Sequence, residues 1–340
     1  MSAAQARCCK ESHPGWERKS CRGCLTAMGN QSSDFGRAVT ALLEYLTRQR
    51  YCFVSVTPST HARVVARRND KAAETLCDAF GWNMPFDKDL LPPDLFAMLH
   101  ADEVVRPNGG LWLSNVRVAS LDSHLFVHSA YPTQEEDAVF FGPDTYRFAS
   151  AVRRRLRTAQ SFKRAVDIGC GTGAAGILIA QRNPEADVLL SDINKRALQF
   201  AATNAAAANV ANVSIHHSNI LTQLPGDFDF IVANPPYMVD VAQRAYRHGG
   251  ASQGTELSLR ILDAALERLV PNGSGLIYTG APVCGGEDIF RAGAESIFSR
   301  HRATWRYDEI DPDVFGEELD QPAYLNVERI AAVVLEFRKG

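Results

Sequence analysis

The chain lacks several features that mark particular classes of protein. It contains no apolar run of about 18 residues, so the sequence predicts no transmembrane helix and no membrane partner. The N-terminal stretch MSAAQARCCKESHPGWERKSCRGCLTA has no apolar core segment, which argues against a secretory signal and favours a cytoplasmic location. The formal net charge is -3, which excludes a strongly basic, histone-like coat protein but leaves a local basic face open.

Cysteine is present, but not in a pattern that holds a metal ion well. Cys21 and Cys24 have the two-residue gap of a zinc half-site. Cys8 and Cys9 are adjacent, and adjacent cysteines rarely chelate one ion. We therefore expect no metal site and interpret residues 1–34 as a disordered tail, with a zinc cluster as the alternative.

Residues 35–135 are predicted to form a smaller, mainly helical domain. In the segment FGRAVTALLEYLTRQRY, four apolar side chains fall on one helical stripe: Val39, Leu42, Leu43 and Leu46. Segment 111–129 is apolar on both sides of Asp122-Ser123, which predicts two strands joined by a tight turn.

Residues 136–340 alternate between strand and helix patterns. Strands are predicted at 164–170, 186–193, 213–218, 228–236 and 274–282, with helices between most of them. Such alternation is typical of an α/β fold with a doubly wound, mostly parallel sheet. The last two strands, 304–310 and 329–337, have no helix between them, which predicts an antiparallel addition at one edge. Ligands of such sheets bind outside the carboxyl ends of the strands.

A glycine-rich turn follows the first of these strands, in VDIGCGTGAAG. Gly169, Gly171 and Gly173 allow a tight turn that presents backbone N–H groups to a ligand. With Gly176 the turn also satisfies the dinucleotide fingerprint G-x-G-x-x-G. Asp167 argues against a pyrophosphate, because a carboxylate at this strand end would repel it and would favour a ligand ammonium group. A plain strand-to-helix turn is the alternative.

Asp192 ends the second strand at the spacing expected for an acid that accepts hydrogen bonds from ribose hydroxyls. An aspartate that only caps the next helix is the alternative. The fourth strand, FDFIVA, ends in Asn234-Pro235-Pro236-Tyr237. Prolines cannot donate to a sheet ladder, so this strand must leave the sheet abruptly.

Together these motifs resemble the class I S-adenosylmethionine-dependent methyltransferases, over residues 140–340. The resemblance implies a seven-stranded, Rossmann-like methyltransferase sheet in a catalytic domain at 136–340, with residues 35–135 recognising the substrate. It implies S-adenosylmethionine as the cofactor, held by residues of the glycine turn and of the strand ends: Thr145, Asp167, Gly169, Cys170, Gly171, Gly173, Asp192, Ile193 and Asn219. Family members usually carry an acidic pair after the third strand, where this chain has Ser218-Asn219.

The motif Asn234-Pro235-Pro236-Tyr237 resembles the signature of enzymes that methylate planar nitrogens. The Asn234 side-chain oxygen and the Pro235 carbonyl can accept the two N–H groups of such a nitrogen and align its lone pair with the methyl carbon. Pro235 and Pro236 hold this geometry by fixing φ, and Tyr237 can stack on the planar substrate.

Two further segments, FFGPDTYRFA and RHGGASQGTELSLRIL, resemble the release-factor glutamine N5-methyltransferase family. The nearest resemblance therefore implies a protein glutamine as acceptor. Adenine N6 or guanine N2 of RNA or DNA, and a small metabolite, are the alternatives. Asp144 and Thr145 are equally well interpreted as a helix cap. A nicotinamide-dependent enzyme and a non-catalytic cofactor-binding protein stay open as other classes.

Overall fold

The computed structural model describes residues 34–68, 72–133, 135–158, 161–240 and 246–340, which belong to one compact unit. Within these ranges, no helix combines the length and the apolar character that crossing a membrane requires. The predicted tail and its zinc alternative fall almost wholly outside the described residues. The predicted domain boundary near residue 135 stays a prediction.

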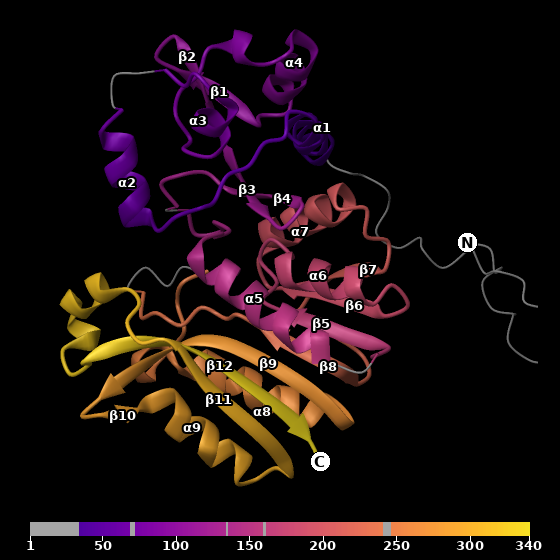
Figure 1. Ribbon diagram of the computed structural model, residues 1–340, viewed down its shortest axis with the longest axis vertical. Helices are drawn as coiled ribbons and strands as arrows, with labels where there is room; N and C mark the ends of the chain where they lie inside the picture. The colour runs from indigo at the N-terminus through magenta and orange to yellow at the C-terminus, as the bar shows by residue number, and fades with distance from the viewer. Residues whose placement is uncertain (1–33, 69–71, 134, 159–160, 241–245) are drawn as a thin grey trace, which may run out of the picture. The chain divides into compact units, whose positions relative to one another are not determined.

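The first part of the described chain is mainly helical, as the sequence predicts (Figure 1). The stripe on α1 is buried as expected, and Pro93 opens α4 in a position where a helix tolerates proline. Its elements are α1 (Asp34–Arg48), α2 (Pro58–Ala66), α3 (Leu76–Phe80), η1 (Lys88–Leu90), α4 (Pro93–Ala101), β1 (Val105–Asn108), β2 (Leu111–Ser114), β3 (Val116–Leu121) and β4 (His124–Ser129).

The two predicted strands at 111–129 are in fact three. β3 and β4 pair antiparallel around Asp122, as expected. The first predicted strand breaks at Asn115, whose backbone N–H donates to the Val104 carbonyl, so β2 pairs with β1 in a separate hairpin. A continuous apolar pattern does not reveal this break.

The remaining elements build the predicted α/β sheet. Its strand order is β11-β12-β9-β8-β5-β6-β7, and the short β10 pairs with β9. β7, β6, β5, β8 and β9 are parallel neighbours, while β12 and β11 are antiparallel, so the predicted fold class is confirmed. The bounds are α5 (Pro143–Thr158), β5 (Arg164–Ile168), α6 (Ala174–Arg182), β6 (Asp187–Asp192), α7 (Lys195–Ala207), β7 (Val213–His217), β8 (Phe228–Ala233), η2 (Ser252–Gly254), α8 (Glu256–Arg268), β9 (Leu269–Cys284), β10 (Glu287–Asp288), α9 (Ile289–Phe298), β11 (Ala303–Asp311), η3 (Gly316–Asp320), η4 (Pro322–Tyr324) and β12 (Arg329–Lys339).

Both faces of this sheet are buried, because successive residues of a strand point to opposite faces. On β8, Phe230 and Val232 join the core that contains residues of α5 and α6. Ile231 and Ala233 join the core that contains residues of α8 and α9. This double cover explains why the strands are continuous apolar runs rather than alternating ones.

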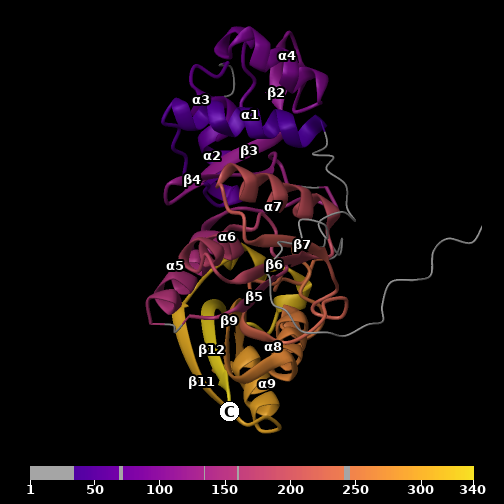
Figure 2. The same cartoon turned by 90° about the vertical axis from the view of Figure 1, so that its right-hand side faces the viewer.

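Helix α7 lies between the sheet and the first part of the chain (Figures 1 and 2). Phe200 and Ala197 of α7 belong to the same apolar core as α1. The buried Asn204 amide accepts a hydrogen bond from the Val127 N–H at 2.8 Å and donates to the Thr172 carbonyl at 2.9 Å. One side chain thus links β4 to the glycine-rich turn.

Candidate active site

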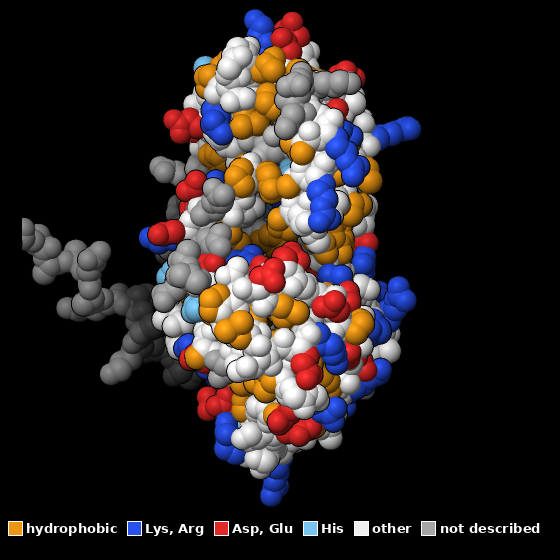
Figure 3. All heavy atoms as spheres, turned by 90° about the vertical axis from the view of Figure 1, so that its left-hand side faces the viewer, with side chains coloured by type: hydrophobic (Ala, Val, Ile, Leu, Met, Phe, Trp, Pro, Cys, Tyr) orange, Lys and Arg blue, Asp and Glu red, His pale blue; other side chains and the backbone are white. Residues whose placement is uncertain are grey.

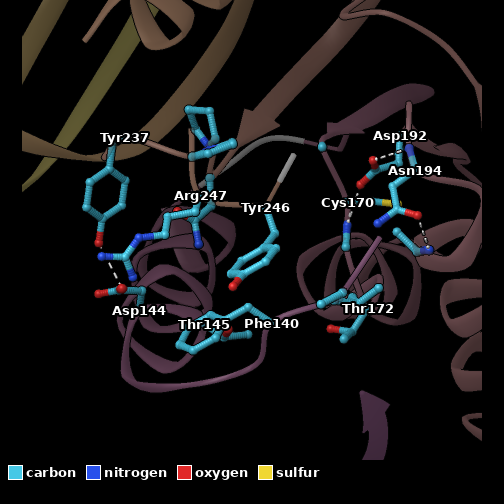
Figure 4. Close-up of a pocket in the computed structure, with 18 of the residues that line it drawn as sticks. Phe140, Asp144, Thr145, Cys170, Thr172, Asp192, Asn194, Tyr237, Tyr246 and Arg247 are labelled. Atoms are coloured by element: carbon cyan, nitrogen blue, oxygen red, sulfur yellow. Dashed lines mark hydrogen bonds between the residues drawn. The ribbon is translucent and has the colours of Figure 1, made fainter. Parts of the chain in front are cut away.

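A cavity of about 470 Å³ lies at the carboxyl ends of β5, β6 and β8, which are neighbours in the sheet. This is the edge where the sequence predicts a ligand, and the volume is in the range of small-molecule sites. Figure 4 shows Cys170 and Asp192 at one side of the cavity and Tyr237 with Asp144 at the other. Residues from the first part of the chain, including Tyr131 and Pro132, complete the wall.

The glycine-rich turn lines one side of the cavity. Gly169 and Gly171 line it, with φ values of 64° and 54° that glycine adopts most easily. A Cβ at Gly169 would meet no atom within 4 Å, so a ligand has room beside the backbone there. Gly173 does not line the cavity, and a Cβ there would lie 3.1 Å from Leu190. Gly173 is the N-cap residue of α6, with a φ of 78°. Its contact with the cofactor stays a prediction.

Two carboxylates face this side of the cavity. Asp167 is buried and accepts a hydrogen bond from the Gly176 N–H at 2.9 Å. Burial, helped by the nearby Asp192, raises the pKa of Asp167 to about 7 despite that hydrogen bond. Asp192 accepts from the N–H groups of Gly171 at 3.0 Å and Asn194 at 2.8 Å, and burial raises its pKa. Asp192 therefore orders the glycine turn, and its carboxylate keeps acceptor capacity for a ligand hydroxyl.

The chemistry of this side fits S-adenosylmethionine. Ile193 lines the cavity with 52% of its surface exposed, which offers an apolar face to a flat ring. Asn219 also lines the cavity, and Gln223 orders its loop by accepting from the Asn219 N–H at 2.7 Å. Asp167 lacks a cationic partner among the residues described, so a ligand ammonium group would neutralise a carboxylate that is costly to ionise alone. The cofactor contacts of Ile193, Asn219 and Asp167 stay predictions.

The predicted acceptor motif lies in the same cavity. Asn234, Pro235 and Pro236 line it directly after β8 ends at Ala233. Main-chain packing fixes this loop, because a Cβ at Gly249 would lie 2.7 Å from the Cα of Tyr237. The structure thus brings the predicted acceptor residues and all predicted cofactor residues except Gly173 to one cavity.

Tyr237 is less open than the stacking prediction implies. Its side chain lines the cavity but is only 7% exposed, and its hydroxyl donates to Asp144 Oδ2 at 2.8 Å. Asp144 lies inside α5 and also accepts from the Tyr278 hydroxyl, so the capping interpretation was wrong for this residue. Thr145 does cap: its hydroxyl accepts from the Gly142 N–H at 3.3 Å, and it lines the cavity as well.

Several cavity residues were not among the predicted site residues. Phe140 begins the segment FFGPDTYRFA, whereas Tyr246 and Phe315 lie outside every motif quoted from the sequence. Arg247 lines the cavity too, and its guanidinium is paired with Glu318 and lies 3.7 Å from Asp240. Tertiary folding brings Tyr246 and Phe315 into the same cavity as Asn234.

A run of arginines at positions 153, 154, 155 and 157 lies on α5, outside the cavity lining. Arg153 pairs with Asp122, Arg154 lies 3.6 Å from both Asp308 and Glu336, and Arg155 donates to Ser274. None of these arginines lines the cavity. On the face drawn in Figure 3, acidic and basic side chains are interspersed rather than gathered by sign.

Comparison with known proteins identifies part of the chain. Residues 141–281 match the family model described as "Methyltransferase small domain". The release factor glutamine methyltransferase of Borreliella burgdorferi is 34% identical over 36% of this chain and 46% of its own length. That of Lactococcus lactis is 33% identical over 45% of this chain and 57% of its own length. The ribosomal RNA small subunit methyltransferase C of Hahella chejuensis is 34% identical over 33% of this chain and 30% of its own length.

The chain thus spans about half the length of the curated glutamine methyltransferases that it matches. The matched segment contains the glycine turn, Asp192 and Asn234. The predicted similarity to S-adenosylmethionine-dependent methyltransferases is therefore confirmed over residues 141–281, and the activity of the whole chain stays a proposal.

Proposed function

We propose that this chain, whose residues 141–281 match the methyltransferase small domain model, methylates a planar nitrogen of a protein glutamine side chain. One observation carries the proposal: Asn234 and Pro235 line the same cavity as Asp167 and Asp192. S-adenosylmethionine would supply an electrophilic methyl group on sulfonium. The predicted cytoplasmic location is part of the proposal.

In this proposal, some cavity residues bind the cofactor and others bind the acceptor amide. Asp167 binds the ammonium group and Asp192 accepts from the ribose hydroxyls. The Asn234 side-chain oxygen and the Pro235 carbonyl accept the two N–H groups of the amide, which orients its lone pair along the line of transfer. These acceptors are fixed before the acceptor substrate binds, so little reorganisation is needed.

The charges around the cavity favour an uncharged amide over a polyanion. The charged residues that line the cavity are Asp144, Asp167, Asp192 and Arg247. Arg247 is already paired with Glu318 and near Asp240, both of which are buried. The lining residues described therefore offer no surplus of positive charge to phosphate groups. The names of the glutamine methyltransferase relatives point to the same acceptor.

A nucleic-acid base is the second candidate. Tyr131, Phe140 and Tyr246 line the cavity, and aromatic rings of this kind suit stacking on a base. The relative named ribosomal RNA small subunit methyltransferase C supports this candidate.

The test is transfer of tritiated methyl from S-adenosylmethionine to a purified bacterial release factor, to small ribosomal subunits and to a lysate separated into protein, RNA, DNA and small molecules. We expect label in protein, on a glutamine identified by mass spectrometry. The matched control is Asn234→Ala, which should cut turnover by roughly 10²-fold while cofactor affinity changes little.

Label confined to RNA or DNA would refute the glutamine assignment and keep planar-nitrogen methylation. Binding of the cofactor without label in any fraction would refute the enzyme proposal. Unchanged turnover in Asn234→Ala would refute the role given to that amide.

A further inference from the structure

The carboxylate of Asp144 is the centre of a buried network at the acceptor side of the cavity. Asp144 is 6% exposed and lies in the first turn of α5, where the helix dipole favours a negative charge. It accepts hydrogen bonds from the hydroxyls of Tyr237 at 2.8 Å and Tyr278 at 2.6 Å. The Arg147 guanidinium donates to it at 3.2 Å and also pairs with Asp311.

This network fixes the side chain that follows the two prolines. The Tyr237 ring contacts the rings of Tyr278 and Phe315 edge to face, at 6.4 and 6.1 Å between centroids. A Cβ at Gly280 would overlap the Tyr237 ring, so the ring packs directly against the β9 backbone at a position that only glycine leaves open. Burial and the neighbouring Asp144 raise the pKa of Tyr237 well above its ordinary value, so the phenol stays a neutral donor.

Asp144 has little capacity left for a proton from the substrate. Three donors occupy its two oxygens, and its contact with the reacting atoms would have to compete with these charge-assisted bonds. Its geometry therefore suits holding a side chain rather than general-base work. Tyr237 lies directly after Pro236, and two fixed φ angles transmit its position to Asn234.

We propose that Asp144 is a positioning residue, which sets the place of the Asn234-Pro235 acceptors through the hydroxyl of Tyr237. The inference rests on the proposed function for its catalytic consequence, while the link itself stands on the contacts of Asp144. It also gives α5 a role in transfer, because Asp144 belongs to that helix and lines the cavity.

Methyl transfer by the full chain tests this role in Asp144→Asn, Tyr237→Phe and the double variant. A displacement of about 1 Å can cost on the order of 10²-fold, so each single variant should lose roughly 10- to 100-fold in kcat. The KM for S-adenosylmethionine should change less than about twofold, because the atoms that hold it are not displaced. The double variant should lose no more than the worse single variant, because both changes break one link.

Tyr278→Phe is the matched control. It removes a hydrogen bond to the same carboxylate, from a tyrosine that does not line the cavity. It should lower the urea midpoint of unfolding about as much as Tyr237→Phe, with a much smaller loss of kcat. Equal losses of kcat in the two phenylalanine variants, unchanged kcat in Asp144→Asn, or losses that multiply in the double variant would each overturn the inference.

If the unmodified chain transfers no methyl group to any acceptor, the proposed function fails and the link is read from stability alone. The same cycle is then measured by urea unfolding. A coupling between Asp144→Asn and Tyr237→Phe supports the link, and additive shifts of the midpoint overturn it.

Discussion

The unusual pKa of Asp167 makes binding of S-adenosylmethionine depend on pH. The proposed contact needs the ionised carboxylate, and burial raises its pKa from 3.8 to about 7 in the free protein. This rise corresponds to about 4 kcal/mol in favour of the protonated form. A cationic ammonium group placed against Asp167 would offset much of that cost, so binding should release a proton below pH 7.

The expected size follows from the fraction of Asp167 that is ionised. With a pKa of about 7, the Kd should be about 25-fold higher at pH 5.5 than at pH 7.5. The comparison ends at pH 7.5 because the α-amino group of the ligand must stay protonated, and α-amino groups lose their proton at about pH 7.7–8.0. Isothermal titration in buffers of different ionisation enthalpy measures both the Kd and the protons released.

The stability of the free protein should fall as the pH rises, whereas the affinity for S-adenosylmethionine should increase. Because the folded pKa is raised, the contribution of Asp167 to stability is present below about pH 4 and is lost as the pH rises through about 7. The thermal stabilisation by the ligand should therefore grow between pH 5.5 and 7.5. Asp167→Asn is the control, and it should remove most of the pH dependence. A Kd constant within about twofold over this range would refute the reasoning.

Two further predictions concern residues around the glycine turn. Gly176→Ala should destabilise the protein by roughly 1–3 kcal/mol in urea unfolding, because its Cβ would overlap Leu190. Gly316→Ala, whose Cβ would meet no atom within 4 Å, should be nearly neutral; equal effects of the two would contradict this account. Asp192→Ala should weaken S-adenosylmethionine binding by roughly 10- to 100-fold, since it loses charge-assisted hydrogen bonds from the ribose and frees the Gly171 and Asn194 N–H groups. Calorimetry measures this, and an unchanged Kd would exclude the ribose contact.

The sequence predicts the sheet well because local patterns determine it. A helix is predicted between the first two predicted strands of this sheet, and the structure has α6 (Ala174–Arg182) there. The last two strands were also predicted as antiparallel, since no helix separates them. The two-residue β10 and the separate β1–β2 hairpin were missed, because they depend on pairing rather than on a periodic pattern.

The candidate site was predictable only where a motif brings its own residues together. The turn at Gly169 and the strand end at Asn234 could be found from residue type and position. The bonds from Asp144 to Tyr237 and Tyr278 join residues that are 93 and 134 positions apart in the chain. No rule based on sequence spacing predicts contacts between residues so far apart. Asp144, which accepts hydrogen bonds from both tyrosines, could therefore be interpreted from the sequence as a helix cap.

The Asn204 side chain limits how far the two parts of this protein can be treated as separate modules. Its amide satisfies the backbone of Val127 and of Thr172 at once, and the neighbouring Phe200 is covered by the core of α1. A fragment that begins at residue 136 would leave a fully buried amide without its β4 partner and would expose an apolar helix face to water. Replacement of the first part of the chain would therefore require matched changes on α7.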